Sequence, residues 1–381
     1  MERAGAGTDR SPLRRRRPSE RHQRGDSAHA QPERRFAIID DSTATLTSKR
    51  SGSEYADLSR EIRGAGLLDR RYRYYAWKIT GNLVALAGAW VAFAFIGDSW
   101  WQLFVAAFLA IVFAQLAFIG HDAGHKQIFR TRRPNSVIGT SHGGLVGMSY
   151  GWWISGHNKH HANPNHEDHD PDLDIPALAF TRGQAGLKTG FLRWMAKHQA
   201  LLFFPLLTLE GWNLHVSGVR ALLRRDVKSP KLETALLAGH FVGYLAAVFL
   251  VLSPGIAVVF IVVHQGLWGV YMGSSFAPNH KGMPTMTGDE SVGFLRKQVL
   301  TSRNVRGGRV VDFVLGGLNY QIEHHLFPNM PRPNLRHAQP IVQRFCAERG
   351  ISYQQCGLFR SYADVLRHLH EMGAPLRAVR A

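Results

Sequence analysis

Cysteine is nearly absent from this chain of 381 residues, which contains only two cysteines. Cys346 and Cys356 lie ten residues apart in the C-terminal part of the chain. Their spacing fits neither a disulfide framework nor the CxxC pairs of a zinc site. The scarcity of thiols therefore excludes a disulfide scaffold and fits a reducing cytoplasm.

Charged residues are absent from three long stretches, at 79–97, 99–120 and 234–280. A membrane-spanning helix needs about 20 apolar residues, so each of the first two stretches predicts one span. The third stretch has Pro254-Gly255 near its middle and predicts two spans joined by a tight turn. We therefore predict an all-α integral membrane protein with four transmembrane helices in two hairpins. The expected spans cover about residues 77–96, 101–121, 235–252 and 256–277.

Acidic residues are also scarce, because 28 Asp and Glu face 46 Lys and Arg, which gives a net charge of +18. Nucleic-acid binding requires base-stacking aromatic residues or a known module among these charges, and the sequence shows neither. Attraction to anionic lipid headgroups explains the basic character more simply. We expect membrane lipid, and no nucleic acid, as a partner.

Lys and Arg are missing from the two expected hairpin turns, at 97–99 and 253–255. Nearly all basic residues lie instead in the N-terminal segment, in the loop 122–233 and in the C-terminal segment. The positive-inside rule therefore places both termini and this loop in the cytoplasm.

We expect residues 1–53 to form a disordered basic tail, because residues 1–35 contain ten Arg and five acidic residues but almost no large apolar ones. The amphipathic segment 54–73 opens the expected membrane domain, 54–370. Residues 371–381 are expected to form a C-terminal tail.

Two further apolar stretches do not qualify as spans. Residues 134–156 carry no charge but contain five glycines between 139 and 151, so we expect an interfacial or re-entrant segment. Residues 199–209 are apolar but few, and they include Pro205. This stretch is expected to form an interfacial helix.

Histidine is abundant, and seven of the 20 histidines lie in three short motifs. These motifs are HDAGH at 121–125, HNKHH at 157–161 and QIEHH at 321–325. Positions i, i+3 and i+4 share one face of a helix, so each motif directs several side chains to one side. Adjacent histidines point about 100° apart on a helix, which lets each reach a different metal ion. A further candidate, His280, lies where the fourth span ends.

Eight histidines are more than one tetrahedral zinc ion can use, since such an ion takes four ligands. The spacing favours two metal ions, whose identity imidazole ligands alone do not fix. The candidate ligands are His121, His125, His157, His160, His161, His280, His324, His325 and Gln321. Acidic residues that we expect to accept hydrogen bonds from imidazoles are Asp122, Asp170, Asp172 and Glu323. Isolated histidines are expected to be structural, namely His142, His166, His169, His198, His215, His240, His264 and His337.

The motifs HDAGH, HNKHH and QIEHH, in this order around two helical hairpins, resemble the three histidine boxes of membrane fatty-acid desaturases. The glutamine that opens the third box resembles the front-end and bacterial acyl-desaturase branch. The stretch 161–172 and the NHxxMP stretch at 279–284 also resemble that branch. The resemblance extends over about residues 55–370.

This resemblance implies a non-haem di-iron enzyme that uses O2 and two external electrons to introduce a cis double bond into an acyl chain. The substrate is an acyl-CoA or an acyl-lipid, and a cytoplasmic helical cap carries the iron site. The resemblance makes the eight histidines iron ligands, and Gln321 stands where other branches place histidine. The hairpins enclose an apolar tunnel, with the acyl headgroup at the basic face.

Many front-end desaturases carry a fused cytochrome b5 domain with a His-Pro-Gly-Gly motif, and this sequence lacks that motif. We therefore expect a separate electron donor, such as a ferredoxin, cytochrome b5 or a flavin reductase. The basic surface is complementary to an acidic carrier. The abundance of Arg over Lys favours a bacterial plasma membrane, and a eukaryotic host implies the endoplasmic reticulum.

Three other functions are less consistent with the sequence. HDAGH has the spacing of the HExxH zinc-protease motif, but Asp122 replaces the required Glu and the other two motifs stay unexplained. A metal transporter holds its ligands near the bilayer midplane, whereas these histidines lie at helix ends. The remaining alternative is a hydroxylase or ketolase on the same di-iron scaffold, and the QIEHH form favours desaturation.

Overall fold

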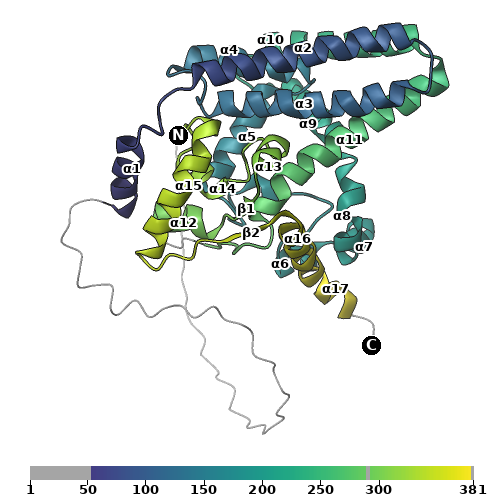
Figure 1. Ribbon diagram of the computed structural model, residues 1–381. Helices are drawn as coiled ribbons and strands as arrows, with labels where there is room; N and C mark the ends of the chain where they lie inside the picture. The colour runs from purple at the N-terminus through teal and green to yellow at the C-terminus, as the bar shows by residue number, and fades with distance from the viewer. Residues whose placement is uncertain (1–52, 289–291, 379–381) are drawn as a thin grey trace, which may run out of the picture. The chain divides into compact units, whose positions relative to one another are not determined.

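The computed structural model describes residues 53–288 and 292–378, which are mostly helical (Figure 1). The predicted disordered tail lies outside the described residues, apart from Ser53. Four helices are long and apolar enough to cross a membrane, which confirms the predicted fold class and the number of spans. They are α2 (Tyr72–Ile96), α3 (Gln102–Gly124), α10 (Pro230–Val251) and α11 (Pro254–His280).

The ends of these helices differ from the charge-free stretches. α2 and α10 begin at Tyr72 and Pro230, rather than near residues 77 and 235. Long charged side chains are tolerated in a first turn because they can reach water, and Pro230 has no N–H group that a helical partner must satisfy. At their other ends, α3 continues to Gly124 and α11 to His280. Both helices therefore carry histidines at the end of their apolar part.

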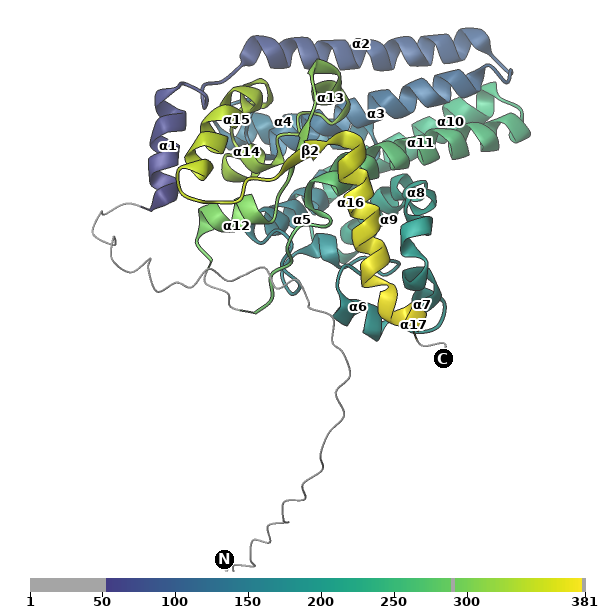
Figure 2. The ribbon, with the colours of Figure 1, turned by 60° about the horizontal axis from the view of Figure 1, so that its bottom comes forward.

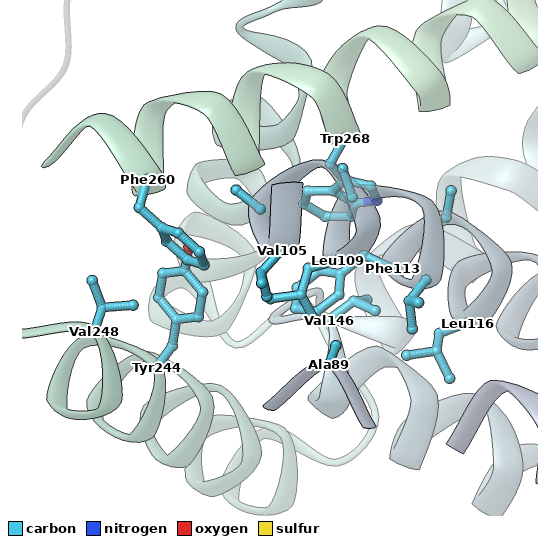
Figure 3. Close-up of a cluster of buried hydrophobic side chains, with 14 of the residues drawn as sticks. Ala89, Val105, Leu109, Phe113, Leu116, Val146, Tyr244, Val248, Phe260 and Trp268 are labelled. Atoms are coloured by element: carbon cyan, nitrogen blue, oxygen red, sulfur yellow. The ribbon is translucent and has the colours of Figure 1, made fainter. Parts of the chain in front are cut away.

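α3 is the central apolar helix. Of the residues in its most apolar stretch, 72% are buried inside the protein, whereas the corresponding share is 17% in α2 and in α10. Side chains from the other three apolar helices and from Val146, Met148 and Leu214 pack around it (Figure 3). The labelled core residues are Ala89, Val105, Leu109, Phe113, Leu116, Val146, Tyr244, Val248, Phe260 and Trp268. The outer faces of α2 and α10 remain apolar, since Phe95 and Leu250 are each 86% exposed. Such faces suit contact with lipid.

Residues 134–156 lie in two helices, α4 (Arg132–Leu145) and α5 (Tyr150–Ala162), and in the short connection between them; neither helix is long enough to span a bilayer. The glycines of this region allow close packing. A Cβ atom on Gly139 would lie 2.3 Å from the Tyr150 ring, and one on Gly143 would lie 2.7 Å from the carbonyl oxygen of Met148. α4 packs against α3 and α10, so the stretch is apolar because it is buried against protein. Its position relative to a membrane stays a prediction.

The remaining elements gather around the C-terminal ends of α3 and α11 (Figures 1 and 2). Those before α10 are α1 (Glu54–Gly64), η2 (Pro171–Leu173), α6 (Arg182–Leu187), α7 (Gly190–Lys197), α8 (Gln199–Leu207) and α9 (Glu210–Arg224). Those after α11 are α12 (Phe294–Leu300), β1 (Asn304–Arg306), α13 (Arg309–Val314), α14 (Gln321–Leu326), α15 (Arg332–Ala347), β2 (Gln355–Gly357), α16 (Leu358–Met372) and α17 (Ala374–Ala378). β1 and β2 form a parallel pair that the sequence analysis did not predict.

The expected domain starts where α1 starts, at Glu54, but its C-terminal boundary differs from the structure. The predicted amphipathic segment forms α1, whose fully buried Leu58 and Ile62 join a core cluster with residues of α14 and α15. At the other end, Leu376 of α17 is buried in a small cluster with Ala185 and Ala196. Residues 371–378 are therefore packed helix rather than a tail, because an apolar side chain every few residues continues to find a partner.

Candidate metal centre

The structure brings all eight candidate histidines together at the ends of four helices. His121 lies in the last turn of α3 and His125 directly follows that helix. α5 carries His157, His160 and His161, and His280 is the last residue of α11. α14 begins with Gln321 and carries His324 and His325. Segments far apart in the sequence thus meet in one buried region.

The imidazoles divide into two groups that share no residue. The five-histidine cluster contains His121, His125, His157, His161 and His324, whose ligand nitrogens lie within 4.8 Å of one another. The three-histidine cluster contains His160, His280 and His325, with the same limit. The rings of His161 and His325 stack at a centroid distance of 4.1 Å, so the two clusters are adjacent.

Helix geometry explains this division. His157 and His161 stand four residues apart on one face of α5, whereas His160 points about 100° away from His161 and joins the other cluster. In α14, the neighbours His324 and His325 likewise point into different clusters, with ring planes 89° apart. Each short helix therefore supplies both clusters.

Hydrogen bonds fix the Nδ1 atoms of the three-histidine cluster. Nδ1 of His160 lies 3.0 Å from each carboxylate oxygen of Asp170. Nδ1 of His280 lies 3.0 Å from the carbonyl oxygen of Thr301, and Nδ1 of His325 lies 2.9 Å from Oε1 of Gln298. An acceptor at Nδ1 places the proton there and leaves Nε2 free to bind a metal ion.

The Nε2 atoms of this cluster converge accordingly. Nε2 of His280 lies 3.3 Å from Nε2 of His160 and 3.1 Å from Nε2 of His325. Nε2 of Gln321 lies 2.8 Å from the same His280 atom, while Oε1 of Gln321 accepts a hydrogen bond from Nδ2 of Asn279. The amide of Gln321 therefore lies beside this cluster, where the sequence predicted a ligand.

The five-histidine cluster is recognisable from nitrogens that lack partners. Among the described residues, Nε2 of His121 and both ring nitrogens of His161 and His324 are buried without a hydrogen-bond partner. Nε2 of His125 faces Nε2 of His157 at 2.8 Å. Buried polar atoms are rarely left unpaired, and a cation at this cluster would take one nitrogen from each of these imidazoles. The donor set thus fits a metal ion.

Burial also favours the neutral imidazoles that a metal ion requires. It lowers the pKa of His125 to about 3 and lowers the pKa values of His157, His161, His324 and His325 well below their ordinary range. His160 differs, because burial lowers its pKa but Asp172 and Asp170 raise it above the usual value. These two carboxylates favour a proton on the imidazole nitrogen that faces them.

Three of the four expected acidic residues lie beside histidines. Asp170 contacts His160 directly, and Oδ2 of the half-exposed Asp172 lies 3.4 Å from the same Nδ1 atom. Oδ1 of Asp122 lies 3.4 Å from Nδ1 of His121. Oδ2 of Asp122 forms a buried ion pair with Nη2 of Arg332, at 2.6 Å.

Glu323 differs from the expectation, because its carboxylate accepts no hydrogen bond from a histidine among the described residues. Its carboxylate accepts hydrogen bonds from Nδ2 of Asn304, at 2.7 Å, and from the hydroxyl of Tyr353, at 2.8 Å. Glu323 precedes His324 on α14 and so points away from the metal-binding face. Burial raises the pKa of this carboxyl to about 7. Glu323 therefore joins α14 to β1 and to the segment before β2.

Several residues around the clusters were not found from the sequence. Gln298, Thr301 and Arg332 support histidines from segments that contain no motif, so no local signal was available for them. Asn279 is an exception, since it directly precedes His280 in the NHxxMP stretch. None of the isolated histidines joins a metal-binding group among the described residues. His264, for example, contacts the hydroxyl of Tyr244 inside the helix bundle.

A large cleft opens beside the five-histidine cluster. Its volume is about 1080 Å³, and His125 and Asn158 line the end that reaches the histidines. The rest of its wall is rich in basic residues, namely Arg70, Lys126, Arg130, Arg132, Arg225 and Lys228. Asp226 and Glu233 are the acidic residues of the wall. The cleft thus presents excess positive charge next to the clustered histidines.

The sequence of this chain is similar to sequences of known proteins. The fatty acid desaturase family matches residues 98–357. Delta(6)-fatty-acid desaturase fat-3 of Caenorhabditis elegans is 28% identical over 87% of this chain and 77% of its own length. Fatty acid desaturase 3 of Bos taurus is 32% identical over 77% of this chain and 67% of its own length. The acyl-lipid (9-3)-desaturase of Physcomitrium patens is 30% identical over 82% of this chain, which spans 62% of that relative.

The match covers three of the four apolar helices, α3, α10 and α11, and every clustered histidine. It implies a fatty acyl substrate and O2, and the clustered histidines imply a metal site in a membrane protein. This chain belongs to the fatty acid desaturase family and is an oxidoreductase that desaturates fatty acids.

Proposed function

We propose that this chain is a di-iron acyl desaturase in which each histidine cluster holds one iron ion. The division of eight clustered histidines into a group of five and a group of three supports this most strongly. Gln321 lies beside the smaller group, with its amide nitrogen 2.8 Å from Nε2 of His280. Imidazole nitrogen suits iron as a ligand, and the family supplies O2 as the oxidant.

The iron ions, when bound, supply the reduction of O2 that drives the removal of two hydrogens from the acyl chain. The balanced reaction converts –CH2–CH2–, O2, two electrons and two protons into –CH=CH– and two waters. The chain's own residues hold and orient the imidazoles. Asp170, Gln298 and the Thr301 carbonyl keep the Nδ1 protons in place, so the Nε2 atoms stay available as ligands.

The basic cleft is the proposed site for the headgroup of the acyl carrier. Both acyl-CoA and acyl-phospholipid carry phosphate, which Arg and Lys side chains bind well. Arg130 and Arg132 lie near the start of α4, and Arg225 and Lys228 lie in the connection between α9 and α10. Because the same cleft reaches His125, a headgroup bound there directs an acyl chain toward the clusters.

The electrons come, in this proposal, from a separate ferredoxin, cytochrome b5 or flavin reductase. The excess of basic residues supports an acidic carrier, since complementary charge speeds association. We place both termini and the histidine clusters in the cytoplasm, because the two hairpin turns lack Lys and Arg. In a bacterial host, the membrane that the four apolar helices cross is the plasma membrane.

The direct test is expression in a host with a simple fatty-acid profile, together with a ferredoxin and its reductase. We compare the wild type with His160→Ala, which removes a proposed ligand, and with His370→Ala, which removes an exposed histidine of α16. A new double bond in the wild type and in His370→Ala only supports the proposal. A product that gains one oxygen instead identifies a hydroxylase or ketolase. No product from the iron-loaded wild type contradicts both activities.

A further inference from the structure

A second, smaller pocket lies between α2, α13 and α15. Its volume is about 240 Å³, and it is lined by Tyr74, Lys78, Arg309, Asp312, Phe313, Gly317, Tyr320, Arg332, Pro333 and Arg336. It shares no lining residue with the large basic cleft. Four cations and one carboxylate thus meet in a space that suits a small anionic group.

Arg332 indicates that this pocket is built for an anion. The residue is 93% buried, since only 7% of its surface is exposed, and its Nη2 atom pairs with Asp122. Its Nε atom is buried and has no hydrogen-bond partner among the described residues. An unpaired buried guanidinium N–H is costly, and Arg332 lines the pocket, so an anion bound within reach of Nε would satisfy it.

Two of the other cations, Arg309 and Arg336, remain available for the same anion, whereas Lys78 donates a hydrogen bond to Oε1 of Gln115. Arg309 and Arg336 are exposed and form no ion pair with a described carboxylate. The single acid, Asp312, already accepts a hydrogen bond from Nδ2 of Asn319, at 2.8 Å. The pocket therefore has more cations than carboxylates, and Asp312 forms no ion pair with Arg309 or Arg336. This excess gives the pocket a positive electrostatic potential.

The walls of the pocket connect it to the apolar surface of a candidate membrane helix. Lys78 lies near the N-terminal end of α2, and its ammonium group sits 4.5 Å above the ring of Phe313. α13 exposes apolar side chains there, with Val310 76% exposed and Phe313 47% exposed. Basic residues next to exposed apolar residues are typical of the headgroup level of a bilayer.

We propose that this pocket binds the phosphate of a membrane phospholipid, with the acyl chains lying along α2 and α13. The lipid is not the substrate, whose headgroup we place in the separate large cleft. The inference rests on the membrane location within the proposed function. The bound phosphate pairs with Arg309 and Arg336 and satisfies the free Nε–H of Arg332, the residue that holds Asp122 next to His121.

Native mass spectrometry of the delipidated full chain in detergent tests this directly. The probes are dioleoyl-phosphatidylglycerol, dioleoylglycerol with the same chains but no phosphate, and inorganic phosphate. We expect the double variant Arg309→Gln/Arg336→Gln to retain one fewer phosphatidylglycerol per chain than the wild type, with at least roughly tenfold weaker binding at this site. The control Arg360→Gln/Arg367→Gln removes the same charge from exposed positions on α16 and should retain the wild-type number.

Other results overturn the proposal. Equal losses from both double variants show non-specific attraction to basic surface. Equal retention of dioleoylglycerol shows that the phosphate has no role, and occupancy by inorganic phosphate without preference for the lipid identifies a free anion as the ligand. The single variant Arg336→Gln repeats the comparison if the double variant unfolds. Because no turnover is measured, failure here is distinct from failure of the proposed desaturation.

Discussion

Oδ2 of Asp122 lies 2.6 Å from Nη2 of Arg332, and this buried ion pair ties the first histidine motif to α15. The same guanidinium donates to the carbonyl oxygen of Phe118, at 2.7 Å, one turn before His121 on α3. Oδ1 of Asp122 faces Nδ1 of His121. A residue from the last third of the chain therefore fixes the end of α3 from which a proposed ligand projects.

Replacement of Arg332 should destabilise the protein strongly. Arg332→Met leaves the carboxylate of Asp122 buried without its partner, which costs about 3–5 kcal/mol. Thermal unfolding in detergent measures the effect, with Gln343→Met as the control, because Gln343 is exposed on the same helix and lines neither pocket. The double variant Asp122→Asn/Arg332→Met removes both charges and should recover part of the loss. Equal stability of the two single variants contradicts a structural ion pair.

Asp170 should control iron binding at the smaller cluster. Asp170→Asn removes the carboxylate whose two oxygens both lie 3.0 Å from Nδ1 of His160. Loss of such a partner typically weakens metal affinity about 10–100-fold. Competition with an iron chelator measures the change, and Asp174→Asn, an exposed acid nearby, should behave as wild type. Equal chelator sensitivity of Asp170→Asn and Asp174→Asn would show that the carboxylate does not orient this ligand.

Gly139 should tolerate no side chain. In Gly139→Ala the new methyl group would lie 2.3 Å from the ring of Tyr150, so this buried ring or the helix α4 must move, at a cost of about 1–3 kcal/mol. Gly81→Ala is the matched control, since a Cβ atom there meets nothing within 4 Å and alanine favours a helix. The unfolding midpoint of Gly139→Ala should therefore fall below that of the wild type, whereas the midpoint of Gly81→Ala should stay the same or rise. Equal midpoints would contradict the close packing of α4.

Much of the fold was readable because its signals are local. Charge-free runs mark the four spans, and the i, i+4 spacing of His121 with His125 and of His157 with His161 predicts shared faces. The separation of His324 from His325 into different clusters follows from the 100° step of a helix. The helix ends at Tyr72 and Pro230 were missed because interfacial charge does not stop a helix.

The residues that hold the histidines and Asp122 in place could not be predicted from the sequence, because their partners are distant in the chain. Nothing near Arg332 marks it as the partner of Asp122, and Gln298 finds His325 only through the packing of α12 against α14. Glu323 shows the opposite error, since proximity to His324 in sequence did not bring its carboxylate to an imidazole. The strands β1 and β2 are three residues each, too short for an alternating pattern to stand out.

The most direct test of two iron-binding clusters is the iron content of the purified, iron-reconstituted chain, measured by elemental mass spectrometry. The account predicts about two iron ions per chain in the wild type, and about one in His161→Ala and in His325→Ala, because each variant removes a nitrogen from a different cluster. A wild type with one ion or none, or one in which another metal displaces iron at both clusters, would contradict the di-iron account.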